Sequence, residues 1–221
     1  MPDRLSAISY QLSARDFSSR DLGVTPFLEA WALQKELVAA RKAGEAADTL
    51  LLVEHPHVIT LGRNACREHI LAEPPEVEVV ETNRGGDVTY HGPGQLVGYP
   101  IFDLAGMGRK DVAWYMRSLE EALIGALGEF GIAGARIPGL TGVWAGHDKI
   151  AALGVHLSRW VTCHGFALNV NPDLAYFECI VPCGIRDHGV TSMERLLGRR
   201  VEMAAVKQSV LRSFERVFFQ A

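Results

Sequence analysis

The chain has 221 residues, 48% of them hydrophobic, and a formal net charge of −4. That length is enough for one well-buried domain or a domain with a small appended lobe, and the hydrophobic fraction excludes a disordered or fibrous protein. The acidic balance gives no global attraction to nucleic acid, which usually requires a clearly basic face.

The N-terminal stretch is polar and carries several acidic residues. It has neither the apolar run of a signal peptide nor the acid-free character of a transit peptide. No window approaches the ~18 apolar residues of a membrane span, and a chain of this size does not need disulfides between its four cysteines. We therefore expect a cytoplasmic protein with no membrane and no nucleic-acid partner.

The expected elements begin with a strand over residues 7–12 and a helix that ends at Gly44. In that helix, Thr25 is the expected N-cap and Pro26 the first helical residue. From Thr49 onward the pattern changes to short β-rich runs. These runs cover residues 50–53, 58–61, 77–80, 88–90 and 96–102.

An amphipathic helix is expected over residues 111–127, where apolar side chains recur at helical spacing. Strands follow at 142–145, 150–157 and 162–170, and a second amphipathic helix closes the chain. Because the strands come in runs without regular βαβ alternation, the sequence predicts an α+β fold, with a mixed β-sheet packed with helices.

The segment from Arg84 to Pro100 holds five glycines in seventeen positions. Glycine at this density weakens a strand unless the backbone turns sharply or closely approaches something, so the segment is typical of a ligand-pocket wall. It contains neither GxxxxGK[ST] nor GxGxxG, and a nucleotide-phosphate cradle is therefore unsupported.

Cys183 lies between Pro182 and Gly184, a setting that predicts a tight turn presenting the sulfur. Lys149 lies 34 residues upstream, at the head of a small and apolar stretch. A thiol becomes a nucleophile at neutral pH only when a nearby cation or base favours its thiolate. The competing interpretations are a buried, inert cysteine and a solvated surface lysine.

A metal site is the second interpretation of the cysteines. Cys179, Cys183 and His188 have plausible ligand spacing, and Cys163-His164 could complete the set. The tight cysteine pair that usually opens a zinc site is missing, and we expect no metal. For His91 and His164, a core histidine and a pocket-wall histidine remain equally open.

Five motifs occur in order between residues 50 and 185: EHPHVITLGR (54–63), RGG…YHGPGQ (84–95), KIAALG (149–154), HGFALN (164–169) and PCG (182–184). In order and approximate spacing the chain resembles the lipoyl/octanoyl transferases of the biotin/lipoate protein ligase superfamily. The resemblance implies a catalytic domain over residues 1–170 and a smaller, helical C-terminal segment, 171–221, that completes the active site.

The same resemblance implies a Cys/Lys dyad, in which Cys183 carries the acyl group as a thioester and Lys149 activates it and moves protons. It implies no cofactor. The implied substrate-binding residues form three groups: Arg84, Gly85, Gly86, Asp87, Val88, Thr89, Tyr90 and His91; Ala152, Leu153 and Gly154; and Gly165, Phe166 and Ala167.

The implied reaction transfers octanoyl from octanoyl-acyl carrier protein to a lysine of lipoyl domains. The acceptors would be 2-oxo-acid dehydrogenase subunits and the glycine-cleavage H protein. The nearest alternative is octanoyl transfer from the H protein to other lipoyl domains. An ATP-dependent lipoate ligase, which would have no use for Cys183, and a non-catalytic lipoyl-domain binder are the others.

Overall fold

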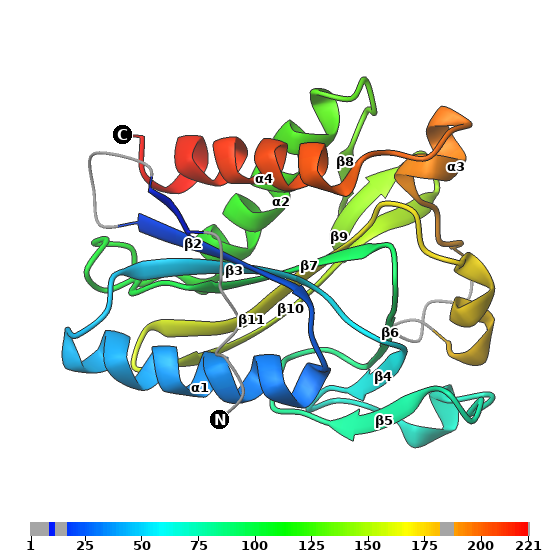
Figure 1. The fold of residues 1–221 in the computed structure, drawn as a ribbon, viewed down its shortest axis with the longest axis horizontal. Coiled ribbons are helices and arrows are strands. Elements are labelled where there is room, and N and C mark those ends of the chain that lie inside the picture. Colours follow the sequence, from blue (N-terminus) through cyan, green and yellow to red (C-terminus); the bar gives the residue numbers. More distant parts are fainter. Residues whose placement is uncertain (1–8, 12–16, 182–187, 221) are drawn as a thin grey trace.

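The computed structural model describes residues 9–11, 17–181 and 188–220 (Figure 1). Its main sheet has eight strands, in the order β1 (Ser9–Gln11), β2 (Phe17–Val24), β3 (Asp48–Glu54), β7 (Gln95–Ile101), β11 (Val161–Asn169), β10 (Asp148–Ser158), β9 (Leu140–Ala145) and β8 (Ala135–Ile137). Among the strands that the structure describes in this sheet, β2 and β3 pair in parallel and the other neighbours are antiparallel, so the sheet is mixed.

A second, three-stranded sheet has the order β5 (Glu78–Glu81), β4 (Val58–Leu61) and β6 (Val88–His91). It lies beside the N-terminal end of α1 (Phe27–Ala43), on the same side of the main sheet (Figure 1). Apolar side chains of β4 and β6 form a core of their own with Ile180.

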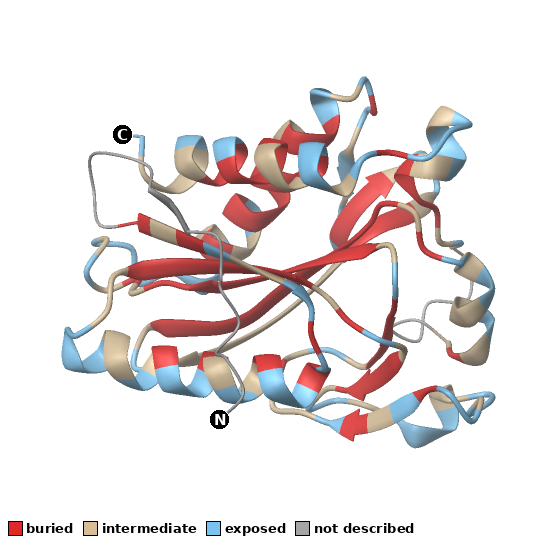
Figure 2. Ribbon diagram, viewed as in Figure 1, coloured by how far each residue is buried: buried red, intermediate tan, exposed pale blue. Residues whose placement is uncertain are grey.

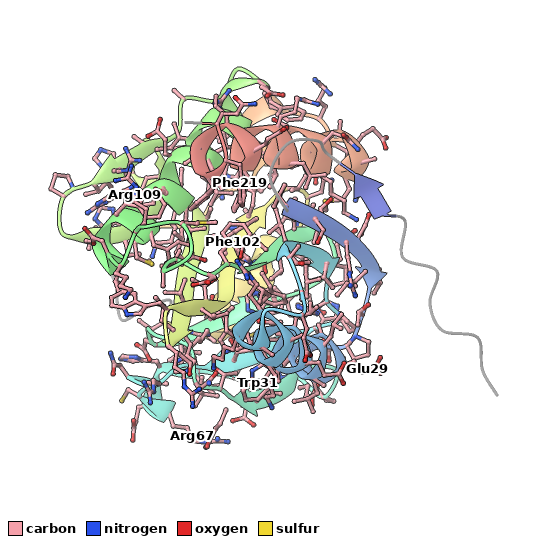
Figure 3. The ribbon with its side chains drawn as sticks, turned by 90° about the vertical axis from the view of Figure 1, so that its left-hand side faces the viewer. Glu29, Trp31, Arg67, Phe102, Arg109 and Phe219 are labelled. Atoms are coloured by element: carbon pink, nitrogen blue, oxygen red, sulfur yellow. The ribbon has the colours of Figure 1, made fainter. Side chains whose placement is uncertain are left out.

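Helices cover both faces of the main sheet. α2 (Val112–Gly128) and α4 (Met203–Phe218) lie on one face and α1 on the other (Figure 1). The strands between these layers are buried along most of their length (Figure 2). Phe102 and Phe219 lie on the α4 side and Trp31 on the α1 side (Figure 3). The predicted α+β class is confirmed.

The sequence predicted the C-terminal end of the first helix correctly and its N-cap wrongly. α1 ends at Gly44, whose φ of 76° is the left-handed conformation that glycine adopts at low cost. The predicted N-cap is wrong, because the Thr25 hydroxyl donates to the Leu22 carbonyl at 2.8 Å and Pro26 occupies the cap position. α2 begins directly after its N-cap Asp111, whose side chain accepts a hydrogen bond from the Trp114 amide.

Several short elements had no clear sequence signal. β2 forms within a polar stretch, with Phe17 and Ser19 buried on one face. The other unexpected elements are β8, α3 (Met193–Leu197) and the 3₁₀ segment η1 (Arg67–His69). A second 3₁₀ segment, η2, covers Leu174–Cys179. The division at residue 170 stays a prediction.

β10 and β11 form the hairpin that carries two of the five motifs. Its two loop residues, Arg159 and Trp160, have φ values of 52° and 65°. Two successive left-handed residues match the twist of the flanking strands. Within the described ranges, no helix is long and apolar enough to cross a membrane.

Candidate active site

A pocket opens between α1, the end of β6 and the face of β7, β11 and β10. It holds about 470 Å³ of space not filled by atoms, part of which is open to solvent. Its lining residues are Phe27, Arg84, Gly86, Thr89, His91, Val97, Tyr99, Ala152, Leu153, Gly154, His164, Gly165, Phe166 and Ala167.

Small side chains on paired strands form the floor of the pocket. Ala152 of β10 lies opposite Ala167 of β11, and Gly154 lies opposite Gly165. Because side chains alternate along a strand, Ala152 and Gly154 share one face. This pattern leaves open space beneath α1 where larger residues would fill the layer.

Most glycines of the pocket wall are required because the backbone of a neighbouring segment comes too close to leave room for a side chain. A Cβ on Gly154 would lie 2.9 Å from the Gly85 carbonyl oxygen, and one on Gly165 would lie 2.2 Å from that of Gly98. Gly86 has a φ of 88°, which other residues rarely adopt. The glycine-rich segment can therefore lie directly against β10.

Arg84 braces this segment from inside the protein. Its side chain donates to the Thr60 carbonyl at 2.6 Å, to the Thr60 hydroxyl and to the Gly85 carbonyl. The Arg84 carbonyl accepts from the Arg63 amide at 2.9 Å. These bonds hold the guanidinium, only 7% exposed, at the pocket wall.

His91 is held by a directed hydrogen bond. Gln95 Nε2 donates to Asn169 Oδ1, so Gln95 Oε1 accepts from His91 Nδ1 at 2.7 Å. Burial, followed by the nearby His55, lowers the pKa of His91 to about 3. The ring is therefore neutral at pH 7.

His164 is neutral for the same reason. Burial, with a smaller effect of Arg84, lowers its pKa to about 3. His164 Nε2 lies 2.7 Å from Asn83 Oδ1. Behind the wall, His55 bonds the Thr25 carbonyl through Nδ1 and accepts from the Tyr99 hydroxyl, and burial lowers its pKa to about 4. These imidazoles add no charge to the pocket at neutral pH.

A second hollow adjoins the pocket and contains Lys149. Its lining residues are Gly85, Gly86, Asp87, Met116, Gly139, Leu140, Thr141, Lys149, Leu153, Gly154 and Val155. We call it the Lys149 groove. Gly86, Leu153 and Gly154 line both spaces, so the groove lies directly beside the pocket.

Lys149 is 8% exposed, which excludes a solvated surface lysine. Its ammonium lies 4.9 Å from the centre of the Trp144 ring, a cation–π distance. Its backbone N–H donates to the Gly189 carbonyl at 2.9 Å, and its carbonyl accepts from the Thr191 amide at 3.0 Å.

Of the predicted substrate-binding residues, ten line the pocket and two, Gly85 and Asp87, line only the groove. Val88 and Tyr90 belong to the core between the small sheet and η2. Alternation along β6 sends them away from Thr89 and His91. The predicted set lacked three further lining residues: Phe27 from α1, and Val97 and Tyr99 from β7.

Cys183 lies outside the described residues. The chain on either side is held near the groove: Val181 donates to the His69 carbonyl, and Gly189 accepts from Lys149.

Buried Cys163 bonds Gln34, and burial raises its pKa to about 11. Among the residues that the structure describes, no three His, Cys, Asp or Glu side chains gather as metal ligands.

The fold is that of lipoate and biotin ligases. A structure of a putative lipoate protein ligase from T. acidophilum superposes with a TM-score of 0.71 at 17% identity, covering 90% of this chain and 84% of that one. Lipoate-protein ligase A bound with ATP gives 0.69 at 18% identity, over 88% of this chain and 82% of its own. These likenesses establish the architecture.

The lipoyl protein ligase A/B catalytic domain model matches residues 26–215, and the chain belongs to this family. Among its curated relatives, an octanoyltransferase of Solibacter usitatus is 56% identical, covering 92% of this chain and 94% of the relative. An octanoyltransferase of Geobacter metallireducens is 53% identical over 88% of this chain and 90% of its own. The resemblance predicted from the five motifs is confirmed.

Proposed function

We propose that the protein is an octanoyltransferase of protein lipoylation that works through a Cys183 thioester. It takes octanoyl from octanoyl-acyl carrier protein and passes it to a lysine of lipoyl domains, in 2-oxo-acid dehydrogenase subunits and the glycine-cleavage H protein. The carrying observation is the largely apolar pocket beside the Lys149 groove, in a chain whose relatives are octanoyltransferases.

The pocket suits the tail of the substrate. Alanine, valine and phenylalanine side chains and bare backbone supply most of its lining, and the low pKa values of His91 and His164 keep both imidazoles neutral. Burial of an alkyl tail of about seven carbons contributes at most ~5 to 6 kcal/mol at ~0.8 kcal/mol per CH₂.

The thioester would lie where the pocket meets the groove, next to Lys149. Cys183 lies six positions before Gly189, whose carbonyl accepts from the Lys149 amide. The covalent path between Cys183 and Gly189 is at most about 20 Å long. This connection supports a Cys183–Lys149 dyad, since a neighbouring ammonium favours the thiolate.

In the first step the Cys183 thiolate attacks the donor's thioester carbonyl. The carbon–sulfur bond to the carrier breaks, and the carrier leaves as a thiol after taking a proton from Lys149. In the second step the acceptor amine attacks the acyl-enzyme, neutral Lys149 takes its proton, and the Cys183 thiolate leaves. Exchange between thioesters is nearly balanced, whereas the change from thioester to amide is downhill and needs no ATP.

The donor distinguishes the candidate functions. Purified protein is incubated with an unmodified lipoyl domain and one of three donors: octanoyl-carrier protein, octanoylated H protein, or octanoate with ATP and Mg²⁺. We expect transfer from the carrier, indifferent to ATP. Transfer from the H protein alone would favour exchange between lipoyl domains, and transfer from octanoate with ATP alone would make the protein a ligase.

A further inference from the structure

Glu120 is a buried carboxylate that the proposed mechanism does not use. It lies on α2, one turn after Met116, a lining residue of the Lys149 groove. Its side chain is only 1% exposed. A buried carboxylate is costly unless charged partners and hydrogen bonds compensate it, so its contacts indicate what it holds in place.

The two carboxylate oxygens of Glu120 have different partners. Oε2 accepts from Arg117 at 2.6 Å and from Arg136 at 3.0 Å. Oε1 accepts from the backbone N–H of Gly142 at 3.1 Å. The arginines therefore compensate the charge, and the other oxygen ties α2 to β9.

The Gly142 amide uses this acceptor at a point where its strand is irregular. β8 pairs with β9 at Trp144 and at Leu140, and the register shifts between these pairs. Among the residues that the structure describes, none of β8 or β10 is paired with Gly142. Its φ of 126° is a conformation that other residues rarely adopt. The Glu120 carboxylate thus takes the place of a sheet partner.

The backbone of Gly142 lies against the stem of Lys149. A Cβ on Gly142 would be 3.4 Å from Lys149 Cε and 3.5 Å from Lys149 Cδ. The pairing of β10 with β9 shifts register between Lys149 and Ala151, so Lys149 lies at a local break in the ladder. Beyond these carbons, the ammonium lies 4.9 Å from the centre of the Trp144 ring. Two residues of β9 thus contact successive parts of one side chain.

The hairpin of β8 and β9 is fastened to α2 at a second point. From β8, Arg136 Nη2 donates to the Arg117 carbonyl of α2 at 2.9 Å. Together with the Glu120–Gly142 bond, this contact holds both strands of the hairpin beside the groove. The residues just before Gly142 form one wall of the groove: Gly139, Leu140 and Thr141.

We propose that Glu120 is a positioning residue: by holding the Gly142 backbone against the Lys149 stem, it keeps the Lys149 ammonium in place at the groove. The inference rests on the proposed function, because it takes Lys149 as the group that moves protons during transfer. Misplacement of a reacting group by about 1 Å can slow a reaction roughly 10²-fold. A displaced Lys149 would therefore slow transfer without weakening the binding of either substrate.

A matched pair of variants isolates the Gly142 contact. Glu120→Met removes the acceptor and keeps an unbranched side chain of similar length. The Arg117 and Arg136 side chains are 55% and 33% exposed, so they stay hydrated after the change. Glu121→Met is the control, because Glu121 accepts from the same Arg136 at 2.7 Å whereas the Gly142 amide bonds Glu120.

NMR of protein labelled with ¹³C at lysine Cε measures the position of Lys149 directly. The chain has five lysines, and the Lys149 signal is the one that Lys149→Met removes. Because the ammonium lies over the Trp144 ring, the ring should shift the Hε protons upfield. We expect Glu120→Met to move this signal toward the unshifted position and Glu121→Met to leave it in place. An unmoved signal in Glu120→Met would overturn the proposal.

Hydrogen exchange in the wild type tests the same contact without a substitution. The Gly142 amide should exchange at least ~100-fold more slowly than in an unstructured peptide, because it is bonded inside the protein. Exchange of the Gly142 amide at the peptide rate would show that Glu120 does not hold it.

Kinetics separate positioning from a general loss of structure. Glu120→Met should lower kcat about tenfold, less than the ~10²-fold expected on removal of the general acid/base itself, with KM unchanged for the carrier and the lipoyl domain. Added to Lys149→Met it should have no further effect, because residues that act through one group are not additive. A loss that persists in the Lys149→Met background, or an unchanged kcat in Glu120→Met, would contradict positioning.

The two proposals fail in different ways. Normal transfer by the wild type, with a Lys149 signal that does not move in Glu120→Met, would refute the role of Glu120 and leave the proposed function standing. Absence of transfer by the wild type, with a Lys149 signal that moves in Glu120→Met, would refute the proposed function and leave the positioning of Lys149 by Glu120 standing.

Discussion

On the proposed function, we expect the floor of the pocket to limit the length of the acyl chain, and Ala152→Val tests this expectation. Ala152 lies opposite Ala167 and lines the pocket. Valine adds two methyl groups to this surface and is well accepted in strands. The glycines are poorer choices, because a side chain on Gly154 would meet the Gly85 backbone and one on Gly86 would need a φ of 88°.

The expected loss follows from the space removed. Two added methyl groups displace about two methylenes of the acyl tail, and each buried methylene contributes ~0.8 kcal/mol. The octanoyl substrate thus loses ~1.6 kcal/mol, or roughly 15-fold in kcat/KM. We expect a hexanoyl chain to end before the obstruction and to keep its rate, so the preference of octanoyl over hexanoyl should fall by about the same factor.

Competition between hexanoyl, octanoyl and decanoyl carriers, scored by the mass of the modified lipoyl domain, measures this ratio. The wild type should prefer octanoyl and tolerate decanoyl, because one methylene discriminates by only about 1 to 3 kcal/mol. Ala135→Val, on an exposed position of β8, is the control. An unchanged ratio in Ala152→Val with full activity would place the acyl chain elsewhere.

Two further predictions concern Lys149 and the buried histidines. Lys149→Met keeps much of the packing against Trp144 and should slow transfer at least 10²-fold, as is typical of a lost general acid/base. Lys149→Arg should be slow as well, because arginine keeps its proton. Near-normal turnover in either variant would remove Lys149 from the mechanism. Burial holds the pKa of His55 at about 4 and of His91 and His164 at about 3, below the ~6.5 of the unfolded chain. The folded state therefore binds fewer protons, so the free energy of unfolding should be greatest above about pH 6.5 and fall by up to ~1.4 kcal/mol per pH unit per histidine as pH drops toward 4. Urea titrations of wild type and His55→Phe at pH 7, 6 and 5 measure this slope, and equal slopes would contradict the assignment.

Hydrophobic periodicity and the positions of glycine and proline predicted most of the fold. The helix ending at Gly44 and the strand at Val58–Leu61 follow directly from a glycine stop and an apolar run. Thr25 is not the N-cap because its hydroxyl donates to the carbonyl of Leu22, which precedes it in the chain. β2 was missed because its neighbours in the sheet, rather than its polar sequence, make it a strand.

The site was predictable where one segment carried several of its residues. The glycine density of Arg84–Pro100 predicted a pocket wall, whereas residues 152–154 and 165–167 were expected from the family resemblance. Phe27 reaches the same pocket from α1, and Val97 and Tyr99 reach it from β7, just beyond the predicted positions 84–91; ordinary helix and strand periodicity gave no reason to single them out. The neutral state of His91 and His164 depends on burial, which the sequence does not display.

The most direct test of the central claim is the mass of the enzyme after exposure to octanoyl-carrier protein without acceptor. We expect the wild type to gain one octanoyl group on Cys183, and Cys163→Ser and Cys179→Ser to gain it equally. Cys183→Ser should gain none. Later addition of an unmodified lipoyl domain should discharge the adduct to an acceptor lysine. An equal adduct on wild type and Cys183→Ser, or an adduct that the lipoyl domain cannot discharge, would contradict the proposed thioester mechanism.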